Sequence, residues 1–199
     1  MNTRTFHTTV AVNGHGPVTV TDHLYGLEYV LVDRDQRWWL GRQWACAGIY
    51  LLLGDSGMTE PPYVGKSHDL LGRVGFQSRQ RDDFARVLFV RRITPWGFTT
   101  GEIGRLEYHI AMLFALTLPG GPRNDNTPEG ATLYSHEEAH VLAYLDSLVA
   151  VLAVLGYGID VEQLNRFASS PEEPDDNAPW PGSSPLDAPP AQSDEGRAA

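Results

Sequence analysis

A glutamate, Glu107, lies within the apolar stripe of a predicted helix, where a charged side chain needs a compensating partner. The segment from about Thr100 to Leu118 has apolar residues at helical spacing, and Glu107 shares its face with Ile103 and Ile110. A carboxylate in such a stripe loses hydration free energy unless a cation or a buried arginine compensates it. The position therefore predicts either a metal ligand or a salt bridge to a nearby arginine.

Two short apolar segments upstream each carry a tyrosine at one end. Gly48 to Tyr50 and Tyr63 to Lys66 are separated by twelve residues, and the turn-rich stretch Leu53 to Gly57 between them predicts an antiparallel hairpin. Arg73 follows ten positions after Tyr63, behind Asp69, which we expect to cap a helix. A tyrosine in a strand is common in protein cores, so the order and spacing of the whole set carry the signal.

This ordered set resembles the GIY-YIG nuclease superfamily over about 80 residues, Ala45 to Asn124. The matching pattern is Gly-Ile-Tyr, then Tyr-Val-Gly-Lys, then an arginine, then a helical carboxylate followed three residues later by Ile110. It is similar to the nuclease domain of the excinuclease family, which also has Tyr-Val-Gly-Lys, and to the GIY-YIG homing endonucleases. The resemblance implies metal-dependent hydrolysis of phosphodiester bonds in DNA.

The resemblance also implies a role for each matched residue. Tyr50 looks like the residue that orients or deprotonates the attacking water, and Tyr63 is similar to the tyrosine that completes the polar site. Arg73 matches the arginine that holds the scissile phosphate. Glu107 matches the only protein ligand of a divalent cation, Mg²⁺ or Mn²⁺, which keeps most of its waters. Lys66 resembles a lysine that would favour the phenolate form of a neighbouring tyrosine.

Basic residues near these positions are expected to contact the DNA backbone, because arginine binds phosphate in a bidentate manner. We assign this role to Lys66, Arg73, Arg79 and Arg81.

The chain departs from the superfamily pattern at two places. Many members carry a histidine four residues after the arginine, where this chain has Gln77; His68 or His109 could stand nearby instead. Members often have an asparagine soon after the catalytic helix, and both Asn124 and Asn126 are available here. His109 lies two residues past Glu107, on another face of the helix, so we expect it at the surface.

A second motif, His136-Glu137-Glu138-Ala139-His140, fits the zinc metalloprotease pattern H-E-x-x-H. Ser135 and Glu138 also form a predicted capping box, and acidic residues are expected in a first helical turn. A third zinc ligand is not evident from the sequence, so we interpret the motif as a helix start.

The net charge of −10 is concentrated at the C-terminal end. From Ser170 onward there are seven acidic residues and one arginine, whereas Trp44 to Asn124 carries nine basic and seven acidic residues. A mildly basic central segment permits phosphate contact. Cys46 is the single cysteine and no signal-like or membrane-length apolar run occurs, so a cytoplasmic protein without a membrane partner is expected.

Pattern and turn signals divide the chain into four segments. Residues 1–43 form a β-rich lead-in with a hairpin at Asn13-Gly14 and strand candidates from Thr8, Val18 and Leu27. Residues 44–126 are the GIY-YIG-like segment, 127–168 are a helical extension, and 169–199 are a Pro/Ser-rich acidic tail expected to be disordered.

The predicted fold is α+β, with a small antiparallel sheet of three or more strands flanked by helices. The predicted function is a Mg²⁺-dependent DNA endonuclease. The alternative is a catalytically inactive nucleic-acid-binding or adaptor module on the same fold.

Overall fold

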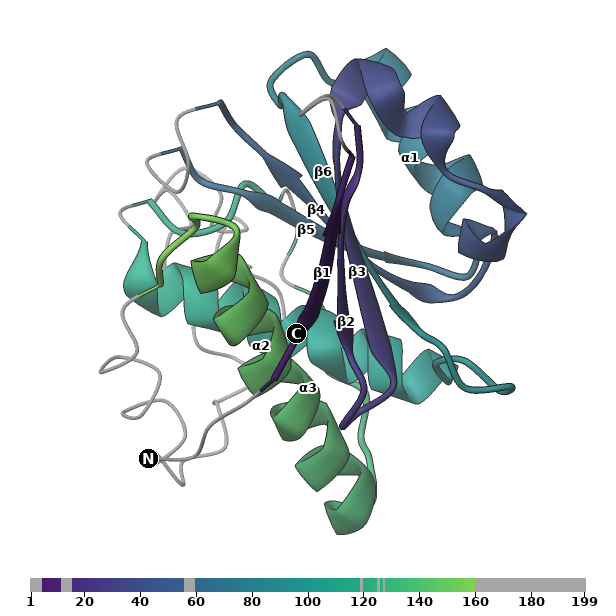
Figure 1. Ribbon diagram of the computed structural model, residues 1–199. Coiled ribbons are helices and arrows are strands. Elements are labelled where there is room, and N and C mark those ends of the chain that lie inside the picture. Colours follow the sequence, from purple (N-terminus) through teal and green to yellow (C-terminus); the bar gives the residue numbers. More distant parts are fainter. Residues whose placement is uncertain are drawn as a thin grey trace, which may run out of the picture.

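The fold is α+β, and its elements are known from a computed structural model that describes residues 5–11, 16–55, 60–118, 120–124, 126 and 128–159, without the side chains of 37, 78 and 79 (Figure 1). The strands are β1 (His7–Val10), β2 (Val18–Asp22), β3 (Leu27–Asp33), β4 (Gly48–Leu53), β5 (Tyr63–Ser67) and β6 (Arg86–Arg92). The helices are α1 (Leu70–Gln80), α2 (Thr100–Thr117) and α3 (Ser135–Val154), with short 3₁₀ turns at Arg34–Trp39 and Arg42–Trp44.

All six strands form one antiparallel sheet in the order β1-β2-β3-β6-β4-β5. The predicted hairpins β1–β2 and β4–β5 are both present. β4 is fully buried between β6 and β5, as its apolar composition predicts. β5 is the edge strand that the preceding Pro61-Pro62 indicates. Because β3 pairs with β6 along its whole length, the predicted N-terminal lead-in extends the same sheet.

The sheet separates two apolar cores, so the molecule has three layers. On one face, Tyr50 and Leu52 of β4 pack with Leu70 and Val74 of α1. On the other face, the alternate residues of β4 pack with the apolar stripes of α2 and α3. Figure 1 shows α1 on one side of the sheet and both long helices on the opposite side.

The N-caps of α1 and α2 are the residues that the sequence predicts, whereas the N-cap of α3 is a different residue. The Asp69 side chain accepts the N–H of Gly72, and Thr99 and Glu102 form the predicted capping box of α2. At α3 the predicted box of Ser135 and Glu138 is wrong. The N-cap is Tyr134, one residue earlier, so Glu137 accepts the backbone N–H of Tyr134.

Two further predictions from the sequence are wrong. The aromatic pair Trp38-Trp39 predicts cover for part of the core, but the two side chains are 74% and 50% exposed, because they lie on a 3₁₀ turn outside the sheet. Helical spacing places Leu142 on the buried side of α3, but it is 37% exposed. The sequence also predicts a short helix at Val161–Phe167, and this segment and the acidic tail lie outside the described residues. No helix among the described residues combines the length and apolarity needed to cross a membrane.

Candidate functional site

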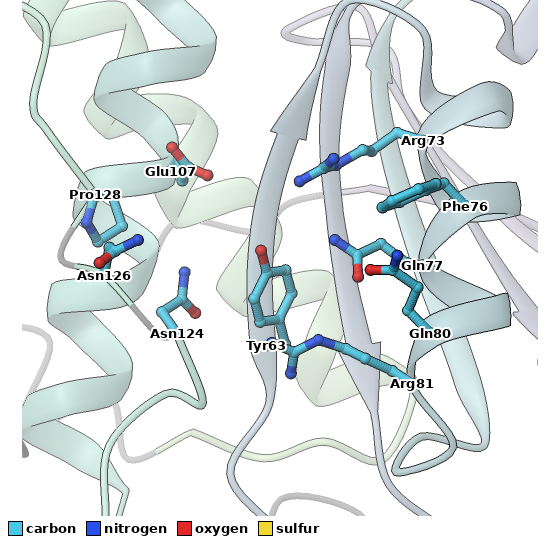
Figure 2. A pocket seen from close by; sticks show the side chains of 10 residues that line it. All are labelled: Tyr63, Arg73, Phe76, Gln77, Gln80, Arg81, Glu107, Asn124, Asn126 and Pro128. Atoms are coloured by element: carbon cyan, nitrogen blue, oxygen red, sulfur yellow. The ribbon is translucent and has the colours of Figure 1, made fainter.

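A polar cavity of about 380 Å³ lies at the β5 edge of the sheet, between α1 and the segment that follows α2. Figure 2 shows its two walls. One wall comes from α1 and the residue after it, with Arg73, Phe76, Gln77, Gln80 and Arg81. The other wall consists of Glu107, Asn124, Asn126 and Pro128. Tyr63 of β5 lies between the walls, so the cavity joins side chains from both faces of the sheet.

The alternation of β5 explains how both faces contribute. Tyr63 and Gly65 pair with Leu52 and Tyr50, which belong to the core under α1. Lys66 pairs with Ile49, which belongs to the core under α2. Since neighbouring side chains of a strand point to opposite faces, one edge strand presents a tyrosine to α1 and a lysine to α2. Within the part of the chain that the structure describes, no further strand covers this edge, so the two sides meet in the cavity.

Lys66 compensates the charge of Glu107. The Lys66 ammonium nitrogen lies 2.8 Å from Oε2 of Glu107, and the Lys66 backbone N–H donates to Oε1 at 3.1 Å. The Glu107 side chain is 12% exposed and the Lys66 side chain 37% exposed. The expectation that this carboxylate needs a cationic partner is therefore met within the protein, by a lysine of β5 and not by an arginine.

Tyr50, Tyr63 and Arg73 form a second group on the α1 side. The Tyr50 hydroxyl accepts a hydrogen bond from Nε of Arg73 at 3.3 Å and a weak one from the Gln77 amide at 3.5 Å. The two tyrosine rings stack with centroids 6.1 Å apart. A Cβ atom on Gly65 would lie 2.4 Å from the Tyr50 hydroxyl, so this ring position requires glycine on the neighbouring strand.

The two tyrosines differ in their access to the cavity. Tyr50 is fully buried and is not among the lining residues, whereas Tyr63 lines the cavity. Burial raises the pKa of Tyr50 to about 12, and the nearby Tyr63 adds to the shift. The neutral phenol of Tyr50 is thus favoured, and Lys66 lies on the opposite face of β5, against Glu107. This geometry favours Tyr50 as a residue that positions Arg73, and Tyr63 as the one that meets solvent.

The other residues expected near the site lie in different surroundings. The Arg81 guanidinium lies 4.4 Å from the centroid of the Tyr63 ring, so it forms part of the cavity wall. Arg79 lies in α1, but its side chain is outside the described part of the chain. His68 is exposed on the turn before α1 and does not line the cavity. Gln77 is buried against Tyr50.

Both candidate asparagines line the cavity, and one of them holds the edge strand. Asn124 accepts the N–H of Val64 at 3.1 Å and donates to the Val64 carbonyl at 2.8 Å. The N–H of Arg123 also donates to the carbonyl of Pro62 at 2.8 Å. The segment after α2 therefore satisfies backbone groups of β5 that an edge strand leaves open. Sequence reasoning named Asn124 but could not assign this pairing, which depends on residues 60 positions apart.

His109 is not at the surface as expected. It is buried, and its Nε2 lies 2.6 Å from Oε1 of Glu138, because α3 packs over that face of α2. Burial lowers the pKa of His109, against an opposing effect of Glu138. Arg105 donates to both oxygens of Glu138 at 3.0 and 2.9 Å. Glu138 thus links two helices.

The H-E-x-x-H motif lacks the surroundings of a zinc site. His136 and His140 are exposed on α3, while Glu138 is engaged by Arg105 and His109. Over the described ranges, no three His, Cys, Asp or Glu side chains gather as metal ligands. A structural or catalytic zinc site needs three or four such ligands, so the described residues around this motif do not form one.

The cavity does fit one loosely held divalent cation. A carboxylate offers about four acceptor positions, and Glu107 uses two of them toward Lys66. Mg²⁺ is commonly bound by one or two carboxylates together with substrate phosphates and retained waters, so Glu107 would supply the protein ligand beside a bound phosphate. Glu107 is the acidic side chain among the lining residues.

Comparisons with known proteins returned no matching family model, no matching curated protein and no matching solved structure.

Proposed function

We propose that the protein is a Mg²⁺- or Mn²⁺-dependent endonuclease of the GIY-YIG type that hydrolyses phosphodiester bonds in DNA. The observation that supports this most is the cavity at the β5 edge, which Tyr63 and Arg73 line from one face of the sheet and Glu107, paired with Lys66, lines from the other. These groups match the needs of phosphodiester hydrolysis, which are a phosphate-binding cation, a polar group for the water and a carboxylate.

Arg73 is the group that binds the scissile phosphate in this proposal. Its Nε donates to the Tyr50 hydroxyl, and contacts with both Tyr50 and Tyr63 raise the pKa of Arg73, so the guanidinium stays charged. The terminal nitrogens carry four N–H groups, enough to donate to phosphate oxygens beside these contacts. Because the guanidinium is already oriented, its charge offsets the negative charge that develops on the phosphate oxygens at little reorganisation cost.

Tyr63 orients the attacking water, since it is the tyrosine that lines the cavity. The water oxygen bonds to phosphorus and loses one proton to solvent, the bond to the leaving oxygen breaks, and the leaving oxygen takes up one proton from solvent. Glu107 would hold the divalent cation, which would supply positive charge near the reacting phosphate when bound. Lys66, on β5, places a second positive charge 2.8 Å from Glu107.

A catalytically silent nucleic-acid-binding module is the second candidate. The observation that favours it is the Lys66–Glu107 ion pair, because the ammonium group already neutralises the carboxylate that a cation would use. Such a module would bind DNA equally well with Mg²⁺ and with a chelator.

The two candidates are separated by incubating the protein with supercoiled plasmid, branched DNA, single-stranded DNA and RNA, with Mg²⁺ or with a chelator. The endonuclease proposal predicts nicked or shortened DNA with Mg²⁺ or Mn²⁺ and not with the chelator, and no cleavage by Glu107→Gln. Binding of DNA with no cleavage in either Mg²⁺ or Mn²⁺ would favour the silent module.

A further inference from the structure

Phe76 is a large apolar side chain in a cavity that is otherwise mostly polar. It lies on α1, is 47% exposed, and lines the same cavity as Arg73 and Glu107. Among the lining residues, only Phe76 and Pro128 lack a polar side-chain group. An apolar ring exposed inside a site with convergent polar groups is typical of a surface that a ligand covers.

The position of Phe76 relative to Arg73 indicates what that ligand is. The Arg73 guanidinium lies 5.8 Å from the centroid of the Phe76 ring, and Figure 2 shows the two side chains next to each other on the α1 wall. A nucleotide carries its phosphate and its base on one sugar. A phosphate-binding arginine beside an exposed aromatic ring therefore matches both ends of a single nucleotide.

We infer that Phe76 stacks on an unpaired nucleobase next to the phosphate held by Arg73, so that the substrate is DNA with unpaired bases at the cleavage position. This inference rests on the proposed function. A base inside a duplex has both faces covered by its neighbours and is open to stacking on a side chain only after it leaves the stack. Removing a base from the duplex stack costs free energy, and unpaired DNA does not incur that cost. The arrangement therefore favours single-stranded or locally melted sites.

The surrounding side chains fit an unpaired base as well. Gln80 stands on the same wall as Phe76, and Asn126 stands on the opposite wall. Both carry amides, which donate to and accept from the edges that a base exposes when it is not paired. The Arg81 guanidinium above the Tyr63 ring adds a second cationic group to the cavity for the backbone of the same strand.

The test is equilibrium binding in a chelator, where cleavage does not interfere. Fluorescence anisotropy is measured on three labelled oligonucleotides of one sequence: the single strand, the full duplex, and a duplex with a central mismatched bubble. The variants are Phe76→Ala, Phe76→Trp and Trp96→Ala. Trp96 is the matched control, because its side chain is 91% exposed and it lies outside this cavity.

Wild-type protein should bind the single strand and the bubble more tightly than the duplex. Phe76→Ala should weaken the first two by about tenfold, the usual effect of losing one base–aromatic stack. Binding to the duplex should change little. Phe76→Trp should retain the preference, and Trp96→Ala should behave as wild type. With 2-aminopurine in the single strand, wild-type protein should quench its fluorescence by stacking, and Phe76→Ala should quench less.

Equal loss of affinity for all three oligonucleotides, or an unchanged preference in Phe76→Ala, would overturn the inference. The proposed function is tested separately by cleavage in Mg²⁺. Cleavage of duplex without any effect of Phe76→Ala would leave the endonuclease standing and reject the stacking site. If binding depends on Phe76 but the protein cleaves no DNA with either Mg²⁺ or Mn²⁺, the stacking site stands and the endonuclease proposal is rejected.

Discussion

The Lys66 ammonium and the Glu107 carboxylate lie 2.8 Å apart and connect the edge strand β5 to helix α2. The connection includes the backbone, because the Lys66 N–H donates to the same carboxylate. This pair sets the distance between the α2 wall of the cavity and the strand that carries Tyr63. In the proposed endonuclease, the pair also keeps the carboxylate in place for the cation.

Replacing Lys66 by Met removes the positive charge and keeps most of the side-chain volume. Glu107 then loses its counter-ion at a largely buried position, so the free energy of unfolding should fall by about 1 kcal/mol, a value reduced because Lys66 is partly exposed. Thermal melting checks this. If Glu107 binds Mg²⁺, added Mg²⁺ should raise the melting temperature of Lys66→Met more than that of wild type. Lys66→Arg is the control that keeps the charge. If added Mg²⁺ raised the melting temperature of the double variant Lys66→Met/Glu107→Gln as well, the assignment of Glu107 as the Mg²⁺ ligand would be contradicted.

Tyr63→Phe and Tyr50→Phe each remove one hydroxyl and should have different effects. Tyr63 lines the cavity, so its loss should lower the single-turnover cleavage rate by about a hundredfold, as expected for a group that contacts the reacting water. Tyr50 acts through Arg73, so its loss should lower the rate less and weaken DNA binding. A larger rate loss for Tyr50→Phe than for Tyr63→Phe would show that the buried tyrosine is the one that contacts the water.

Tyr50 should stay protonated well above neutral pH, because burial raises its pKa to about 12. The folded state therefore favours the phenol. The contribution of the neutral Tyr50 phenol to the free energy of unfolding should be complete below about pH 10, the pKa of tyrosine in the unfolded chain. This contribution should be lost as pH rises through about 12. Urea unfolding at about pH 9 and pH 11 measures this loss, which should be smaller in Tyr50→Phe. An ultraviolet titration in which Tyr50 ionises near its ordinary pKa would contradict the account.

Asn124→Ala removes both hydrogen bonds to Val64 and leaves the edge of β5 without that partner. The free energy of unfolding should fall by about 1–2 kcal/mol. Cleavage should also slow, because β5 carries Tyr63 and Lys66. Asn126→Ala removes an amide from the same cavity and should cost less stability. Chemical denaturation of both variants tests the difference, and equal losses would show that the Val64 pairing adds nothing.

Local chemistry made several elements predictable. The hairpin of β4 and β5, the edge position of β5 and the caps at Asp69 and Thr99 follow from short-range turn and capping rules, and all are present. The need of Glu107 for a cationic partner also followed from its position on one helix face. These features depend on residues close in sequence or on the burial of a single face.

Features that depend on packing between distant elements were not predictable. His109 points away from the stripe of α2, yet α3 buries it and provides Glu138 as its partner. Tyr50 loses access to solvent because α1 packs over it, which a strand pattern does not reveal. The glycines Gly72 and Gly75 predict a short helix that ends at Phe76, but α1 continues to Gln80 and places the Phe76 ring in the cavity.

Plasmid nicking by wild type and by Glu107→Gln, with melting temperatures measured on the same samples, tests the proposed endonuclease most directly. The variant keeps the shape of the side chain and loses the charge that would hold the cation. We predict that wild type nicks supercoiled DNA in Mg²⁺ and is silent in a chelator. The variant should remain folded and lose at least about a hundredfold in rate, as expected when positioned electrostatic stabilisation is removed. Nicking at the wild-type rate by folded Glu107→Gln would contradict the account.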